Sequence, residues 1–166
     1  KRYKNFDILI KAYSKTKLVN QKFNICCVGG GDFSGEENKI FNSLNLKKNI
    51  KYLEATDYEL IEKYRTASLF VTTSLGEGFG LPALEAMSCK CKVLASDIPV
   101  YRETLKNFGH FFNPSDEDDL KNKLESILIE NKKSSELNID EAYNHSTKFT
   151  WNNCAKETLE IYKELI

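Results

Sequence analysis

The stretch Glu77-Gly-Phe-Gly-Leu-Pro-Ala-Leu-Glu85 lies between two short, mainly apolar runs, residues 68–72 and 91–95. A short apolar run bounded by turn residues is typical of a buried strand. The glycines end the first of these strands, and Pro82 is favoured at the first position of a helix. The segment therefore predicts a strand, a glycine loop, a helix and a second strand in succession.

The same alternation extends outward along the chain. Ser34 with Glu37 and Thr56 with Glu59 each form the pattern of a capping box, which marks a helix start, and we expect Ser115 to cap a later helix. Helices are predicted over residues 4–19, 34–44, 56–67, 82–89, 115–130, 135–148 and 151–166, and strands over residues 23–28, 50–53, 69–72, 91–95 and 108–112.

Strands that alternate with helices through short connections predict a parallel sheet with helices on both faces. The fold class is therefore α/β, a Rossmann-like doubly wound sheet, in one domain over residues 1–166. Ligands of such sheets bind at the carboxyl ends of the strands. The turns at 29–31, 53–57, 74–81 and 96–101 should lie together at that edge.

Composition excludes several classes of protein. Lys and Arg balance Asp and Glu at 24 each, so there is no electrostatic case for nucleic acid. No apolar window is long enough to span a membrane. The five cysteines contain no C-x-x-C, and the two histidines lack metal-ligand spacing, so we expect no metal site and a reducing compartment. Asp116-Glu-Asp118 is interpreted as the acidic start of a helix.

The glycine loop carries the candidate chemistry. A helix opened by Gly80-Leu81-Pro82 offers free N–H groups and a positive dipole end, which suit phosphate. The carboxylates of Glu77 and Glu85 suit sugar hydroxyls, which donate hydrogen bonds to them. Phosphate and hydroxyl contacts together indicate a nucleotide-sugar. Alternatively, Glu85 complements the helix dipole and Glu77 is a solvated loop residue; Gly78 and Gly80 favour the ligand, because glycine lets backbone approach it closely.

Residues 74–97 resemble the central motif of retaining GT-B glycosyltransferases, of the group 1 or family 4 type, in which two glutamates separated by seven residues lie in a run similar to EGFGLPALEAM. The segments Lys1–Tyr13, Asp97–Glu103 and Phe149–Trp151 resemble the flanking parts of those enzymes. The resemblance covers essentially the whole chain. It implies the C-terminal, donor-binding half of a longer two-domain enzyme, with the central first strand missing and extra C-terminal helices.

The resemblance also implies roles for three charged residues. Glu85 would accept hydrogen bonds from the ribose hydroxyls, and Glu77 would hold hydroxyls of the transferred sugar. Lys4 would neutralise the pyrophosphate. A fixed lysine and a helix N-terminus can stabilise the charge that develops on the leaving diphosphate without a metal.

Further donor contacts are implied at glycine-rich backbone. The group around the loop comprises Gly78, Phe79, Gly80 and Leu81, and the group after the first predicted strand comprises Gly30 and Gly31. The second group is not a dinucleotide fingerprint, because Ser34 stands where that motif has its last glycine. One departure from the family pattern is Lys90, where glycine would end the helix; lysine in a left-handed conformation there costs about 1 kcal/mol.

The expected function is transfer of a hexose-type sugar, with retention, from a UDP- or GDP-sugar to a glycan or lipid-linked acceptor in bacterial surface polysaccharide synthesis. The acceptor would bind an N-terminal domain of the same enzyme, and no cofactor is expected. The enzyme would be cytoplasmic, peripheral on the inner face of the membrane through that domain. The alternatives are a GT-B-like epimerase or phosphorylase, a non-catalytic nucleotide-sugar-binding module and, more distantly, a dehydrogenase.

Overall fold

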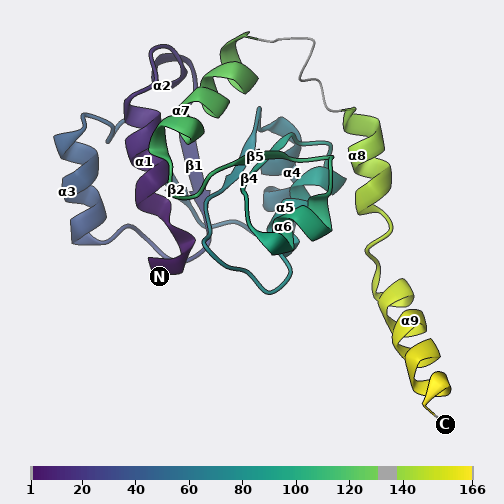
Figure 1. Ribbon diagram of the computed structural model, residues 1–166. Helices are drawn as coiled ribbons and strands as arrows, with labels where there is room; N and C mark the ends of the chain where they lie inside the picture. The colour runs from purple at the N-terminus through teal and green to yellow at the C-terminus, as the bar shows by residue number, and fades with distance from the viewer. Residues whose placement is uncertain (1, 131–137, 166) are drawn as a thin grey trace.

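The computed structural model describes residues 2–130 and 138–165 as an α/β structure (Figure 1). Strand β1 (Ile25–Val28) pairs with β2 (Ile50–Leu53) in one sheet. A second sheet has the order β3 (Phe70–Thr72), β4 (Val93–Ser96) and β5 (His110–Phe112). Every pair is parallel, as the alternation of strands and helices predicts.

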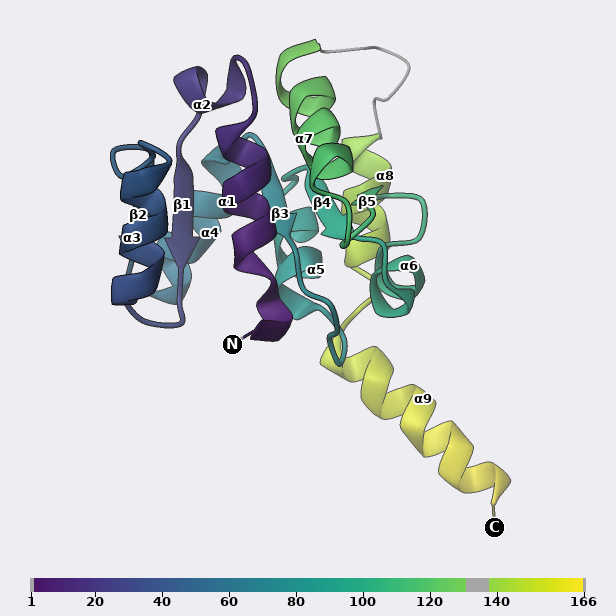
Figure 2. The same ribbon diagram turned by 60° about the vertical axis from the view of Figure 1, so that its left-hand side comes forward.

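Helix α1 (Phe6–Ser14) lies over the interval between the two sheets (Figure 2). Its residues Leu9 and Ala12 belong to one apolar cluster with Ile25 of β1 and Val71 of β3. Among the described residues no strand joins β1 to β3, so the parallel sheet is divided at this point. This agrees with the expectation of an incomplete central sheet.

Helices cover both faces of the second sheet. On one face, α5 (Leu81–Ser88), α6 (Pro99–Leu105) and α8 (Ile139–Ser146) contribute to a single apolar cluster. On the other face, α1 and α7 (Glu117–Glu125) pack against each other and over β4 and β5. All four residues of β4 are consequently buried.

The capping boxes are confirmed. Helix α3 (Gly35–Ser43) starts where Ser34 Oγ accepts from the Glu37 N–H at 3.2 Å while the Ser34 N–H donates to Glu37 Oε2 at 2.7 Å. Helix α4 (Asp57–Thr66) starts with the same reciprocal pair, made by Thr56 and Glu59. These local signals fix both helix starts because each satisfies two backbone donors that the helix would leave unbonded.

The predicted helix over residues 4–19 is wrong as one element. It divides into η1 (Arg2–Lys4), α1 and α2 (Val19–Lys22). Asn5 interrupts the first junction in a left-handed conformation with φ 50°. At the second junction, the Thr16 hydroxyl donates to the Tyr13 carbonyl and accepts from the Asn20 N–H, so its side chain replaces helical backbone bonds.

Three further differences from prediction concern helices. Asp116, not Ser115, caps α7, because its carboxylate accepts from the N–H groups of Asp118 and Asp119; the helix-start interpretation of this acidic segment is confirmed. The helix predicted to Glu130 ends at Glu125 and continues as the π-helix η2 (Ser126–Glu130). Helix α6, which sequence patterns did not assign, begins inside the turn predicted at 96–101.

The C-terminal helices differ in their packing. Helix α8 contacts α5, and residues 135–137 of the helix predicted over 135–148 lie outside the described residues. Helix α9 (Trp151–Glu164) extends away from the body of the molecule, and all of its residues are exposed (Figure 1). None of the helices in residues 2–130 and 138–165 is long and apolar enough to cross a membrane.

Candidate functional site

The loop from β3 to α5, residues 73–80, ends at the tip of a helix that no side chain caps. Gly80 is the N-cap residue and is left-handed, with φ 83°, and Pro82 is the second residue of the helix, one position later than predicted. Because a helix leaves its first N–H groups without intrahelical partners, the tip of α5 presents donors and a positive dipole end at the carboxyl edge of the sheet. This is the geometry of an anion site.

The side chain of Tyr101, in α6, packs against the loop at Gly80. Its side chain is only 2% exposed, and its hydroxyl is hydrogen-bonded to Thr72 Oγ1 at 2.8 Å. A Cβ added at Gly80 would lie 2.6 Å from Tyr101 Cε1, so the ring leaves room for glycine alone. Tyr101 was not identified from the sequence as a site residue. It could have been considered because it lies in the turn at 96–101, which was predicted to lie at the same edge of the sheet.

Lys4 and Glu77, which are 73 residues apart, form an ion pair with 2.6 Å between Nζ and Oε1. Two hydrogen bonds hold the chain beside the loop: Thr73 Oγ1 donates to the Lys4 carbonyl at 2.8 Å, and the Leu75 N–H donates to the Tyr3 carbonyl at 2.7 Å. The structure therefore brings the two candidate catalytic side chains into direct contact at the loop.

Both members of this pair are charged at neutral pH. The hydrogen bond to Glu77 raises the pKa of Lys4 above its ordinary value, against the opposing effect of burial. Burial favours the neutral form of Glu77, but hydrogen bonds from Lys4 and Ser74, with the charge of Lys4, outweigh it and lower the pKa of Glu77. The site thus holds a fixed cation and a fixed anion side by side.

Glu85 is the fifth residue of α5 and lies in its second turn, whereas the sequence placed it in the first. A dipole effect falls off beyond the first turn, so that alternative role is weakened. The Tyr64 hydroxyl from α4 donates to Glu85 Oε2 at 3.2 Å. The pKa of Tyr64 is raised by burial and then by the Glu85 charge, so the phenol remains a donor at neutral pH. Tyr64 is a second residue that sequence reasoning missed.

The glycine turn after β1 lies at the carboxyl end of its strand, as does the 73–80 loop (Figure 2). Gly29, Gly30 and Gly31 all have positive φ, between 78° and 84°. A Cβ at Gly29 or Gly31 would meet no atom within 4 Å, so the backbone, not packing, requires glycine there. Gly30 and Gly31 therefore share the predicted edge but belong to the other sheet.

The end of α5 confirms the departure predicted at Lys90. This lysine is left-handed, with φ 61°, where glycine would normally be favoured. Its Nζ forms an ion pair with Asp140 of α8 at 2.7 Å and lies 5.3 Å from the centre of the Tyr143 ring. The Lys90 side chain therefore links the end of α5 to α8, although its own backbone conformation is unfavourable.

Phe79 projects from the tip of the loop, and its side chain is 45% exposed. Its ring meets Phe149, beyond α8, edge to face at 5.8 Å. Leu81 is exposed beside it at the first position of α5. Within the described ranges no cluster of three His, Cys, Asp or Glu side chains is placed to hold a metal ion.

A divided parallel sheet with helices on both faces, an uncapped helix tip at its carboxyl edge and an ion pair beside that tip define an α/β domain of the Rossmann-like class. A family model described as glycosyl transferases group 1 matches residues 1–145, and the chain belongs to this family. The family is a retaining one, and the domain matches the C-terminal half of GT-B glycosyltransferases. The predicted family and fold are therefore confirmed.

Relatives and solved structures agree with this assignment. The chain is 39% identical over 111 residues to the serotype-specific mannosyltransferase WbdA of Escherichia coli, covering 67% of this chain and 14% of that protein. It is 32% identical over 127 residues to the O-antigen chain mannosyltransferase RfbU of Salmonella typhimurium, covering 75% and 35%. The crystal structure of Anabaena HepE in complex with UDP and glucose superposes with a TM-score of 0.82 at 20% identity, covering 99% and 46%. The chain thus spans less than half the length of each.

Proposed function

We propose that this chain is the donor-binding domain of a retaining glycosyltransferase that transfers a hexose from a nucleoside-diphosphate sugar. The observation that carries the proposal is the Lys4–Glu77 pair at the uncapped tip of α5. The names of WbdA and RfbU favour mannose as the hexose. They also favour an acceptor that belongs to an O-antigen or a similar surface polysaccharide, either a glycan or a lipid-linked acceptor.

The ion pair provides a cation for the leaving group. When a donor enters, its diphosphate competes with Glu77 for the Lys4 ammonium, since phosphate oxygens accept strong charge-assisted hydrogen bonds. The N–H groups of Gly80 and Leu81 at the helix tip then face the same phosphates. Charge that develops on the departing diphosphate is stabilised by groups already in place.

The displaced Glu77 is free to accept hydrogen bonds from hydroxyls of the transferred sugar. An ionised carboxylate has no proton to donate and acts as an acceptor only. Gly78 and the Phe79 N–H lie next to it along the loop and would contact the same sugar. In this proposal Lys4 binds the phosphate part of the donor and Glu77 binds its sugar.

Glu85 would bind the ribose of the nucleotide. Tyr64 donates to Oε2, and the remaining lone pairs of the carboxylate stay available for two ribose hydroxyls. Gly30 and Gly31, in the turn after β1, would approach the nucleotide from the other sheet.

The acceptor is proposed to bind an N-terminal domain of the same enzyme. This chain covers 35% of RfbU and 46% of the HepE chain. The remaining length of those proteins is enough for a second domain. The proposal places the enzyme in the cytoplasm, peripheral on the inner face of the membrane through that domain.

Isothermal titration of the natural-length enzyme with GDP-mannose, UDP-glucose and GDP tests the proposal. We expect saturable binding of at least one sugar nucleotide, and Glu85→Ala to weaken it by about 1–3 kcal/mol because hydrogen bonds to a charged acceptor are lost. Absence of binding to every donor contradicts the proposal. Isomerised or phosphorolysed sugar without transfer to an acceptor identifies the epimerase or phosphorylase, and binding without turnover identifies a non-catalytic module.

A further inference from the structure

Four aromatic rings form a row from the interior of the molecule to the candidate donor loop. Phe108 stacks on His145 with ring centres 4.8 Å apart, and His145 meets Phe149 edge to face at 5.3 Å. Phe149 in turn meets Phe79 edge to face at 5.8 Å. All three spacings lie within the range that favours aromatic pairs. The row connects the end of α8 to the residue between the two loop glycines.

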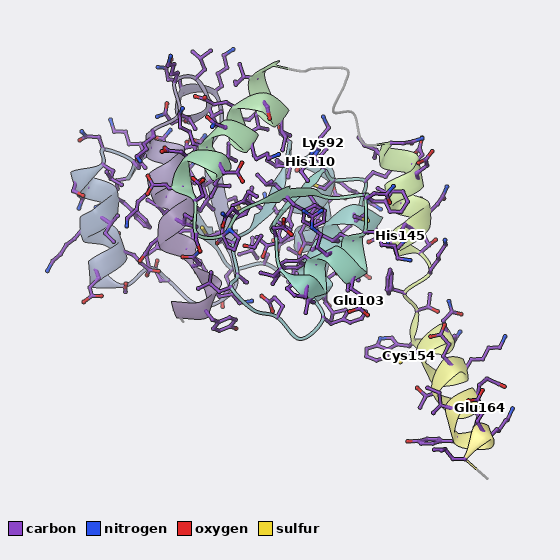
Figure 3. All side chains as sticks on the ribbon, viewed as in Figure 1. Lys92, Glu103, His110, His145, Cys154 and Glu164 are labelled. Atoms are coloured by element: carbon purple, nitrogen blue, oxygen red, sulfur yellow. The ribbon has the colours of Figure 1, made fainter. Side chains whose placement is uncertain are left out.

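His145 anchors this row. It is 5% exposed, and Figure 3 shows it on α8 beside the body of the molecule. Its Nε2 lies 2.8 Å from the carbonyl oxygen of Thr104 in α6. Since a carbonyl oxygen only accepts, Nε2 carries the proton and donates, which fixes the plane of the imidazole. Phe149, although 40% exposed, is therefore packed against a ring that cannot turn freely.

On the Gly78 side of Phe79, no neighbouring atoms of the described residues restrain the chain, so the ring contact with Phe149 supplies a restraint there. It lies between Gly78 and Gly80, and a Cβ at Gly78 would meet no atom within 4 Å. Glycine gives the chain access to conformations that other residues avoid. Among the described residues, Phe149 is the ring that packs on Phe79. This contact joins the loop to a residue 70 positions later in the chain.

We propose that Phe149 is a positioning residue for the donor loop: held by His145, it fixes Phe79 and so aligns the N–H groups at the tip of α5 for the donor. The part of this inference that concerns donor binding rests on the proposed function. Its structural part, the restraint of the loop by Phe149, stands without any ligand. The two parts require separate experiments.

Hydrogen exchange in the natural-length, ligand-free protein tests the restraint. We expect Phe149→Ala to accelerate exchange of the amides in residues 76–81 by about three- to tenfold, the factor that corresponds to loss of one edge-to-face pair. Phe149→Tyr keeps the ring and should retain protection. The matched control is Trp151→Ala, which removes a neighbouring aromatic side chain that is 84% exposed. Unchanged exchange in the loop, or equal acceleration throughout α5, overturns the proposal.

A double-mutant cycle tests the consequence for donor binding. Phe79→Ala and Phe149→Ala should each lower kcat/KM for the donor by about three- to tenfold, and the double variant should be no worse than either alone, because both remove the same ring pair. Phe149→Tyr, which keeps the ring, should retain the wild-type value; additive losses, or an equal loss in Phe149→Tyr, overturn the positioning role. If wild-type enzyme binds no donor while exchange responds as expected, the proposed function fails and the restraint stands.

Discussion

The two sheets of this domain differ in how completely they are covered. Strand β4 is buried along its whole length between helices on both faces, whereas β1 alternates, with Cys26 and Val28 exposed on the side opposite α1 and α3. Lys4, Glu77 and the tip of α5 are positioned against the covered sheet. The glycine turn after β1 extends from the open one. Groups that must be held accurately lie on the densely packed half, as preorganised chemistry requires.

The largest effect should follow loss of the cation on the covered half. We expect Lys4→Met to lower kcat/KM by about 100- to 1,000-fold, because the charge on the leaving diphosphate loses a fixed partner. The matched control is Lys15→Met, since Lys15 forms an ion pair of the same length, 2.6 Å, with Glu117 away from the loop. Steady-state kinetics with the natural-length enzyme measure both. Equal losses in the two variants would contradict the assignment of Lys4.

Core truncations should separate the two sheets by stability. Leu94→Ala removes a completely buried side chain of β4 and should lower the free energy of unfolding by about 2–5 kcal/mol. Val28→Ala, on the open face of β1, should cost less than about 1 kcal/mol, since little apolar area is uncovered. Urea unfolding monitored by circular dichroism gives both values. Similar costs would mean that the open face is covered in solution.

Two glycines with nearly the same backbone conformation offer a closer comparison. Gly80→Ala combines a positive φ with a Cβ 2.6 Å from Tyr101 and should destabilise the fold by about 2–4 kcal/mol. Gly31→Ala has only the positive φ, with no atom within 4 Å of its Cβ, and should cost about 1–2 kcal/mol. Thermal melting ranks the two variants. The reverse order would mean that a Cβ meets a closer steric contact at Gly31 than at Gly80.

Acid should weaken the covered sheet through His110 of β5. Burial, followed by the charges of Lys92 and Lys123, lowers the pKa of His110 below its ordinary value. The unfolded chain therefore binds the proton first, and stability is lost as the pH falls from about 6.5 toward the folded-state pKa. His110→Gln removes this titration. Melting temperatures at pH 7.5 and 5.5 should differ less in the variant than in wild type; an unchanged difference would exclude His110 as the source.

The smallest effect concerns two adjacent thiols that face opposite sides of β1. Burial raises the pKa of Cys27 to about 12, and burial likewise raises that of Cys91 in the covered half to about 11. Cys26 and Cys154 are exposed. Iodoacetamide at pH 8 should therefore modify Cys26 and Cys154 before Cys27 and Cys91, with little change in stability. Mass spectrometry of peptides resolves the order, and early modification of Cys27 would show that both faces of β1 are open.

Local patterns predicted the parts of this structure that depend on near neighbours. The capping boxes at Ser34 and Thr56 were readable because donor and acceptor lie three residues apart. The contact between Lys4 and Glu77 could be expected only from the resemblance to a known family, since nothing in composition or periodicity joins residues 73 positions apart.

The supports of the site were beyond such patterns. Tyr101, Tyr64 and Phe149 act through contacts made by folding, and each is an ordinary aromatic residue in its own segment. The break at Asn5 was missed for a related reason. Its left-handed backbone goes with a side-chain amide that donates to the carbonyl of Pro114, far along the chain. Tertiary contacts of this kind override local helical preference.

Helix α9 gives the protein an optical reporter. The sequence contains a single tryptophan, Trp151, and its indole is 84% exposed at the start of that helix. When excited at a wavelength that tyrosine does not absorb, its fluorescence should therefore be that of an indole in water, with no second tryptophan to correct for. Any surface that covers α9, whether another domain or another copy of the chain, would move this emission toward the blue. Assembly could thus be followed without a label.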